Sequence, residues 1–116
     1  MLPSPNRLPH EAFRRLFQTG KRTFCDEFQI ISLPNGLQVS RFAVQVGVNI
    51  DKRATHRNRM KRLIREAIRK LLPDMKNGFD VIIIAQKNFA EKKEKEIEHS
   101  LKEILNHFQI LNNVTI

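Results

Sequence analysis

Apolar residues recur at helical spacing in three separate segments of the chain. In residues 57–72 they fall at i, i+3, i+4 and i+7 along one side of a predicted helix, and Pro73 ends the pattern. Residues 9–19 repeat apolar positions in the same way, from Pro9 to a terminating Gly20. Residues 90–108 form the third segment, whose other face mixes lysine and glutamate. We therefore expect three helices.

Between and after these helices the pattern is typical of strands. Residues 28–32 and 41–48 alternate at period two around a turn signal at 34–36, and residues 21–24 are compatible with a further short strand. Residues 80–85 are a short apolar run that predicts a buried strand. The predicted fold class is α+β: an α-β-β-β-α-β-α sandwich with helices packed on a single, mainly antiparallel sheet.

The length of 116 residues fits one domain, and we expect residues 1–116 to form a single domain. Residues 1–8 are expected to be a loose extended arm, and residues 109–116 a frayed tail. The single cysteine, Cys25, excludes an internal disulfide and indicates a reducing compartment, so we expect a cytoplasmic protein. No apolar run is long enough to cross a bilayer, and the first residues do not resemble a signal peptide.

Positive charge is concentrated in one segment. The chain has a formal net charge of +9, and residues 41–70 contain ten lysines and arginines against two acids. Such an excess in a small domain indicates a polyanionic partner, with nucleic acid favoured over an anionic membrane.

The predicted helix at 57–72 carries this charge on the side opposite its apolar stripe. That side presents Asn58, Lys61, Arg62, Arg65 and Arg69 to solvent. Guanidinium groups donate paired hydrogen bonds to phosphate oxygens, so a row of them suits a nucleic-acid backbone. A merely solvated helix face usually mixes signs, whereas residues 57–65 contain no acid, so nucleic-acid binding is the favoured interpretation.

At this point the sequence resembles a known family. The stretch Lys52-Arg53-Ala54-Thr55-His56-Arg57-Asn58-Arg59-Met60-Lys61-Arg62-Leu63-Ile64-Arg65-Glu66 resembles the signature of the bacterial ribonuclease P protein component. The family core is Arg-Asn-Arg, then an apolar residue, Lys-Arg, two apolar residues and Arg-Glu. Residues 13–17 with Gly20-Lys21 resemble the family's first helix, residues 42–48 its third strand and residues 78–85 its last strand.

The resemblance implies a function and a topology. It implies the protein subunit of a ribonucleoprotein endoribonuclease, which binds ribonuclease P RNA and the 5′ leader of precursor tRNA and assists removal of the leader. Hydrolysis is then expected from the RNA subunit with bound Mg²⁺, with no catalytic residue, metal or small-molecule substrate held by the protein. The family's β-α-β crossover is left-handed, although the general rule predicts the opposite hand.

Two sets of site residues follow from the charge pattern and the resemblance. The RNA-binding set is Lys52, Arg53, Arg57, Asn58, Arg59, Lys61, Arg62, Arg65 and Arg69. The cleft for the leader is expected to contain Phe13, Phe17, Asn58, Lys61 and Arg65. Aromatic residues at i and i+4 of a helix are core residues about as often as they line a binding site, so the two phenylalanines are also compatible with a structural role. His56, next to Arg57, is the histidine expected near RNA.

Other functional classes fit less well. A general RNA-binding module, such as a ribosomal protein without a role in tRNA processing, is the main alternative. A DNA-binding regulator lacks a visible helix-turn-helix pair. A membrane-surface helix is disfavoured because the apolar stripe is explained as core. A protein-only nuclease would need clustered acids or a histidine-based acid–base pair, and neither spacing is present.

Overall fold

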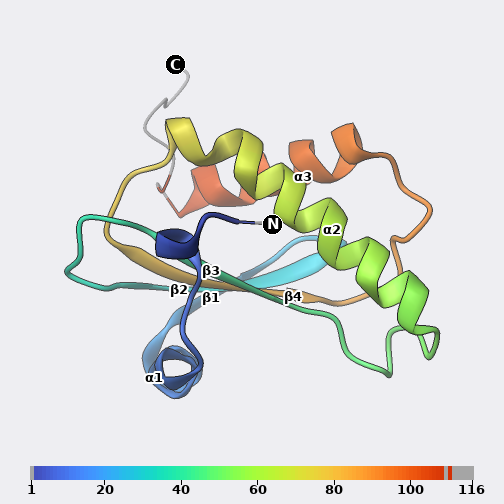
Figure 1. The fold of residues 1–116 in the computed structure, drawn as a ribbon, viewed down its shortest axis with the longest axis horizontal. Helices are drawn as coiled ribbons and strands as arrows, with labels where there is room; N and C mark the ends of the chain where they lie inside the picture. The colour runs from blue at the N-terminus through green and yellow to red at the C-terminus, as the bar shows by residue number, and fades with distance from the viewer. Residues whose placement is uncertain (1, 109, 111–116) are drawn as a thin grey trace.

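The computed structural model describes residues 2–108 and residue 110, and these fold around one four-stranded sheet (Figure 1). The described elements, in chain order, are a 3₁₀ turn at Ser4–Asn6, a second at His10–Ala12, α1 at Phe13–Thr19, β1 at Lys21–Phe24, β2 at Phe28–Pro34, β3 at Arg41–Gln45, α2 at Ala54–Leu71, a 3₁₀ turn at Leu72–Asp74, β4 at Phe79–Ala85 and α3 at Glu94–His107. The predicted α+β order is confirmed, including the short strand at residues 21–24.

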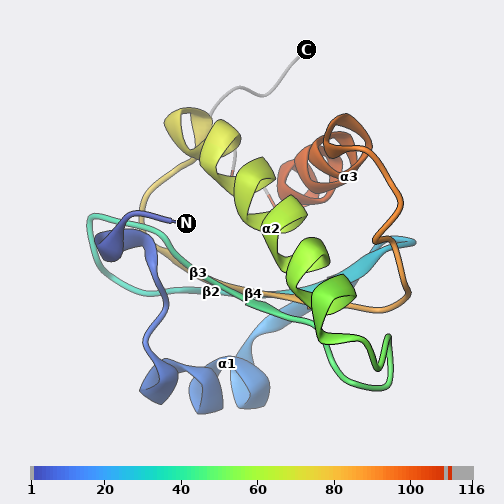
Figure 2. The ribbon, with the colours of Figure 1, turned by 45° about the vertical axis from the view of Figure 1, so that its right-hand side comes forward.

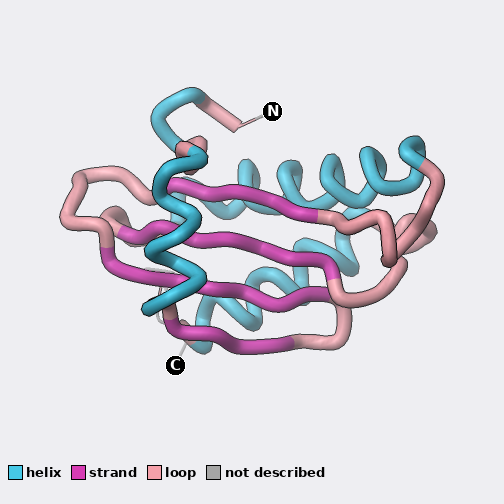
Figure 3. The backbone as a smooth tube through the Cα atoms, turned by 90° about the horizontal axis from the view of Figure 1, so that it is seen from below, coloured by secondary structure: helices cyan, strands magenta, loops and turns pink. Residues whose placement is uncertain are grey.

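The sheet has the strand order β1-β2-β4-β3, which places β3 at an edge. β1 pairs antiparallel with β2, and β2 with β4, whereas β3 and β4 are parallel. The sheet is therefore mainly antiparallel, as predicted. In Figure 3 β3 and β4 run in the same direction, with α2 behind them on the far face. The β-α-β crossover from β3 through α2 to β4 is left-handed, as the resemblance implied.

The helices cover the two faces of the sheet unequally. α1 crosses one face, where Leu8, Leu16, Ile31 and Ile82 form a small buried cluster. α2 and α3 lie side by side on the other face, over a larger core (Figure 2). The apolar stripe predicted for α2 faces this core: Met60, Leu63, Ile64, Ala67, Ile68 and Leu71 are all buried. Burying it leaves the cationic side of α2 to solvent.

Several element boundaries differ from those predicted. α2 begins at Ala54 instead of residue 57, because Asp51 accepts a hydrogen bond from the Arg53 main-chain N–H (2.9 Å) and forms the turn that starts the helix. β3 ends at Gln45 instead of residue 48, since its partner β4 ends one residue after the last pair, Gln45 with Ile84. The first predicted helix opens with a 3₁₀ turn at His10–Ala12, and α3 begins at Glu94 rather than residue 90.

The N-terminal arm is not loose, and that prediction is wrong for its described part. Leu2 is buried in the larger core, and Leu8 in the cluster under α1. The Leu8 main-chain N–H donates to the Phe42 carbonyl (2.9 Å), so the arm is hydrogen-bonded to β3. These contacts hold the arm against the edge of the sheet.

Most of the predicted frayed tail, residues 109 and 111–116, lies outside the described residues. Ile110 is described and is buried. Its main-chain N–H donates to the Leu105 carbonyl (3.0 Å), and its own carbonyl accepts from Lys76 N–H (2.6 Å). At this position the chain is packed rather than frayed.

Candidate nucleic-acid interface

The exposed side of α2 carries an open row of cationic residues, Lys61, Arg62 and Arg65. Arg62 and Arg65 are exposed and Lys61 is half-buried. Within residues 2–108 and 110, none of the three side chains has a hydrogen bond or an acidic partner. The neighbouring Asn58 side chain is exposed and also has no partner there. The open row is therefore unneutralised and accessible to an anion.

The two arginines of Arg-Asn-Arg have a different environment. One Arg57 Nη donates to the main-chain carbonyls of Asp51 (2.9 Å) and Lys52 (2.8 Å). Arg59 Nε donates to the carbonyl of Ala90, in the loop between β4 and α3. Carbonyl acceptors carry no formal charge, so both guanidinium groups remain cationic while they hold two loops against the start of α2.

Two members of the predicted RNA-binding set are paired with the protein's own acids. Arg53 contacts Asp51 (3.0 Å), and Arg69 contacts Glu66 (2.7 Å). The hydrogen bond from Arg69 lowers the pKa of Glu66 below its ordinary value. Lys52 is exposed, and its side chain has no partner among the described residues. The predicted set is thus gathered around α2, and most of its cations whose side chains have no partner among the described residues belong to the open row.

Asp51 organises the start of α2, which the charge pattern did not reveal. Its carboxylate, 5% exposed, accepts hydrogen bonds from the Arg53 guanidinium (3.0 and 3.1 Å) and the Asn88 amide (2.7 Å). The His56 ring lies against it at 3.0 Å. The bonds from Arg53 hold the pKa of Asp51 well below its usual range. The carboxylate is therefore ionised and joins both loops to the cationic helix.

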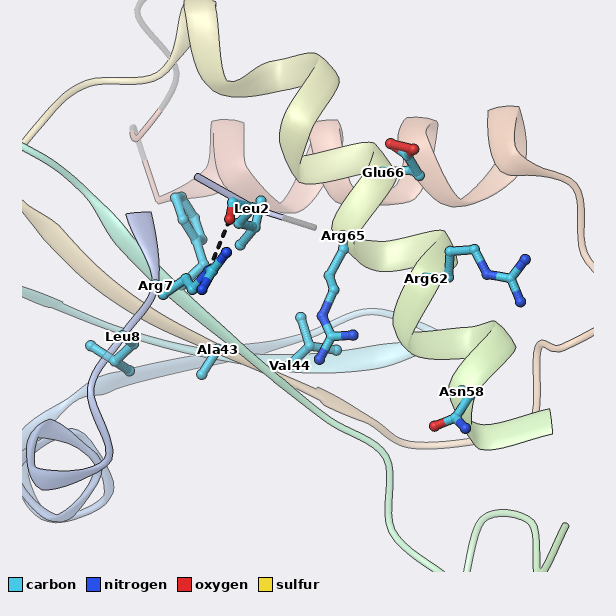
Figure 4. Close-up of a pocket in the computed structure, with 10 residues that line it drawn as sticks. Leu2, Arg7, Leu8, Ala43, Val44, Asn58, Arg62, Arg65 and Glu66 are labelled. Atoms are coloured by element: carbon cyan, nitrogen blue, oxygen red, sulfur yellow. Dashed lines mark hydrogen bonds between the residues drawn. The ribbon is translucent and has the colours of Figure 1, made fainter. Parts of the chain in front are cut away.

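A groove runs beside the open row, between α2 and the N-terminal arm (Figure 4). Its sides and floor are formed by Leu2, Arg7, Leu8, Phe42, Ala43, Val44, Asn58, Arg62, Arg65 and Glu66. Arg65 extends from α2 toward Val44 of β3. The groove was not predicted, because the arm was not expected to pack. Of the residues expected in the leader cleft, it contains Asn58 and Arg65 but not Lys61.

The two phenylalanines expected in the leader cleft lie on the other face of the sheet, with α1. Phe13 packs against the small cluster under α1, and its ring lies 5.1 Å from that of His10. Phe17 is 39% exposed, and the guanidinium carbon of Arg22 is 5.8 Å from its ring centroid, a cation–π geometry. Phe13 therefore has a mainly structural environment, and Phe17 an exposed one. The structure does not gather them with Asn58, Lys61 and Arg65 into one pocket.

Comparisons with known proteins agree with this architecture. Residues 2–109 match the family model described as Ribonuclease P. The ribonuclease P protein component of Microcystis aeruginosa is 36% identical, over 90% of this chain and 91% of its own. The structure is similar to that of the RNase P protein from Thermotoga maritima, with a TM-score of 0.79, 26% identity, and coverage of 87% of this chain and 96% of the other.

A second solved structure, the RNase P protein of Staphylococcus aureus, has a TM-score of 0.81 at 23% identity, with 92% of this chain and 98% of the other covered. At that identity the likeness establishes the fold alone. Within residues 2–108 and 110, no helix is both long and apolar enough to span a membrane. The family match and the Microcystis relative carry the assignment: the chain belongs to the ribonuclease P protein family and is a protein component of ribonuclease P.

Proposed function

We propose that this protein binds ribonuclease P RNA and the 5′ leader of precursor tRNA, and so assists endonucleolytic removal of the leader. The observation that carries the proposal is the open row of Lys61, Arg62 and Arg65, whose charges have no acidic partner among the described residues. Unpaired cations of this kind bind RNA phosphates and release the counterions condensed on the RNA. The affinity of such binding falls steeply as the salt concentration rises.

Rigid placement of the row supports this function. Residues on α2 are held by a buried apolar face beneath them and by the Asp51, Arg57 and Arg59 bonds at the start of the helix. Phosphate contacts from a preorganised helix lose little backbone freedom on binding compared with contacts from a mobile loop. The exposed ring of Phe17, with Arg22 beside it, offers a second surface on which an unpaired base of the leader stacks.

Chemistry is assigned to the RNA subunit. Among residues 2–108 and 110, no three histidine, cysteine or acidic side chains are grouped to hold a metal ion. We place the catalytic Mg²⁺ on the RNA, where its charge polarises the scissile phosphate. The protein contributes binding and positioning. We also place its action in the bacterial cytoplasm, a reducing compartment compatible with the free thiol of Cys25.

Reconstitution tests the proposal directly. The full chain is added to a bacterial ribonuclease P RNA at low Mg²⁺, and cleavage of precursor tRNA is followed with a long leader and with a leader of a single nucleotide. We expect the protein to increase cleavage of the long-leader substrate more than that of the single-nucleotide-leader substrate. Equal stimulation of both substrates would reject leader binding and support binding of the RNA subunit only.

The same assay separates the alternative of a general RNA-binding module. Such a module binds RNA with the same salt dependence but does not restore leader cleavage at low Mg²⁺. Binding without rescue would therefore favour the alternative over the proposed function.

A further inference from the structure

β1 forms the edge of the sheet opposite β3, and its outer side is open. Residues of an antiparallel pair direct their main-chain groups alternately toward the partner strand and away from it. The Cys25 N–H donates to the Phe28 carbonyl (2.9 Å) at the turn into β2, so Thr23, two residues earlier, also faces β2. Arg22 and Phe24 therefore direct their main-chain N–H and carbonyl groups outward, where no strand of the described residues pairs with them.

Two hollows lie along this outer side, between β1 and the C-terminal part of α3, which lies above the hairpin of β1 and β2 (Figure 2). The first hollow, of about 540 Å³, is lined by Lys21, Arg22, Thr23, His107 and Phe108. The second, of about 490 Å³, is lined by residues 23–27 and by Ser100, Glu103, Ile104 and His107. Thr23 and His107 belong to both hollows, which therefore adjoin each other and form one groove beside the strand, the β1–α3 groove.

The first hollow is cationic. Lys21 is exposed, and its side chain has no partner among the described residues. The Arg22 guanidinium donates to the Phe17 carbonyl (2.9 Å), which carries no formal charge, so Arg22 also remains unneutralised. No acid of the described part of the chain lines this hollow. An anionic side chain that enters it is attracted by both cations and meets no competing carboxylate.

The second hollow is partly apolar, and its acids are paired. Phe24 is 61% exposed, and Ile104 adds apolar surface from α3. Each acid that lines the hollow faces a basic side chain: Asp26 lies 2.6 Å from Lys87, Glu27 2.8 Å from Lys92, and Glu103 2.5 Å from His99. This hollow therefore suits a small apolar side chain better than a charged one.

We propose that the β1–α3 groove binds an extended, acidic segment of a protein partner, which adds a strand to the sheet on the outer side of β1. Strand addition gains affinity from main-chain hydrogen bonds and specificity from hollows that take alternate side chains. Side chains two residues apart in a strand point to the same face, about 6.6 Å from each other. Lys21 and Thr23, which line the first hollow, and Cys25, which lines the second, have this repeat. The order of the hollows therefore predicts an acidic and an apolar residue separated by one position.

Charge and main-chain geometry favour this occupant over the alternatives. Pairing of two copies of the chain through β1 would bring their Lys21 and Arg22 side chains together, and like charges across strands are destabilising. RNA supplies phosphates for these cations but has no alternating N–H and carbonyl groups to pair with Arg22 and Phe24. The groove also lies at the edge of the sheet opposite β3, so the proposal does not depend on the proposed function, and the open row stays free for RNA.

Amide hydrogen exchange of the full chain tests the added strand. The probe is the heptapeptide Thr-Glu-Thr-Val-Thr-Glu-Thr at millimolar concentration, which carries the predicted spacing in both chain directions. We expect the Arg22 and Phe24 amides to exchange about tenfold more slowly with the peptide, because only an acceptor on the outer side of β1 protects them. Unchanged exchange would overturn the proposal. Equal slowing by pentauridylate, or by a rise in protein concentration alone, would overturn it in favour of RNA or of a second copy.

A charge reversal provides the second test. Lys21→Glu should lower the affinity for the glutamate peptide by about tenfold and raise the affinity for its lysine analogue, Thr-Lys-Thr-Val-Thr-Lys-Thr. A gain of affinity for the lysine peptide cannot come from a folding defect. Lys95→Glu, an equal charge change at an exposed position near the start of α3, should leave both affinities unchanged. Equal effects in the two variants, or no effect in Lys21→Glu, would reject the β1–α3 groove as the site.

Discussion

The side-chain amide of Asn88 donates a hydrogen bond of 2.7 Å to the carboxylate of Asp51, across 37 residues of sequence. The contact joins the loop after β4 to the turn before α2. The same carboxylate accepts from the main chain and guanidinium of Arg53, with the His56 ring at 3.0 Å. One buried acid thus holds the first turn of the helix that carries the open row.

Asp51→Asn should make the stability of the protein less dependent on pH. Hydrogen bonds from Arg53 hold the pKa of Asp51 well below its usual range in the folded state. The carboxylate therefore stabilises the fold fully above roughly pH 5, and this stabilisation is lost as the pH falls below about 4 toward the lower folded-state pKa. We expect Asp51→Asn to have a lower free energy of unfolding than wild type at pH 7, with a smaller difference at pH 3.

Urea denaturation at the two pH values measures this difference. Asp74→Asn is a matched control, because Asp74 is exposed and its side chain has no partner among the described residues. Its difference from wild type should stay near zero at pH 7. A constant penalty for Asp51→Asn at both pH values would show that shape, rather than charge, accounts for the role of Asp51.

The open row should determine the salt dependence of RNA binding. Arg62→Ala and Arg65→Ala each remove an unneutralised cation, so each should lower the slope of log affinity against log salt concentration by about 1. Binding of ribonuclease P RNA is measured by filter retention between low and moderate salt. Lys95→Ala, an exposed change on α3, should keep the wild-type slope. A uniform loss of affinity with the slope unchanged would show that these residues act on the fold.

Substitutions of Arg59 and Arg62 should differ in their effect on the stability of the fold. Arg59 Nε donates to the Ala90 carbonyl, so Arg59→Ala should lower the free energy of unfolding by about 1 kcal/mol. Arg62 has no partner among the described residues, and Arg62→Ala should change stability by less than about 0.5 kcal/mol. Urea denaturation measures both variants. If both are equally stable, Arg59 does not anchor the loop after β4.

The sequence predicted the elements of this fold well, because apolar periodicity reports which side of each element is buried. The stripe from Met60 to Leu71 identified both the buried side of α2 and its cationic opposite side. Boundaries were less accurate where a side chain outside the element sets them. α2 starts three residues earlier than predicted because Asp51 bonds to Arg53, and an aspartate two residues before Arg53 is a sequence signal for such a turn.

The groove and the division of roles among the arginines were beyond sequence analysis. Arg7 and Val44 are far apart in sequence, and only the bridge from Arg7 to Phe42 brings the arm beside β3. Apolar periodicity places Arg59 and Arg62 in the same class of polar helix positions. In the structure the Arg59 side chain donates to the carbonyl of Ala90 in a distant loop, whereas the Arg62 side chain has no partner among the described residues. Both features depend on long-range contacts that local patterns do not encode.

Gly20 should be sensitive to the addition of a single methyl group. It follows α1, where its N–H donates to the Leu16 carbonyl (2.8 Å), and a Cβ at this position would lie 2.5 Å from that oxygen and against Ile31. Because Leu16 is 1% exposed and fixes α1 to the sheet, neither neighbour moves freely. We expect Gly20→Ala to lower the free energy of unfolding by about 1–3 kcal/mol.

Gly47→Ala is the matched control for this change, because the added Cβ would meet mainly the flexible end of the Asn49 side chain. That side chain can rotate away, so the free energy of unfolding should fall by less than in Gly20→Ala when both are measured in urea. The Gly20 penalty should also appear as a disturbed α1, seen as faster amide exchange at Leu16 and Phe17. Equal penalties in the two variants would mean that the end of α1 yields more readily than its packing against Ile31 indicates.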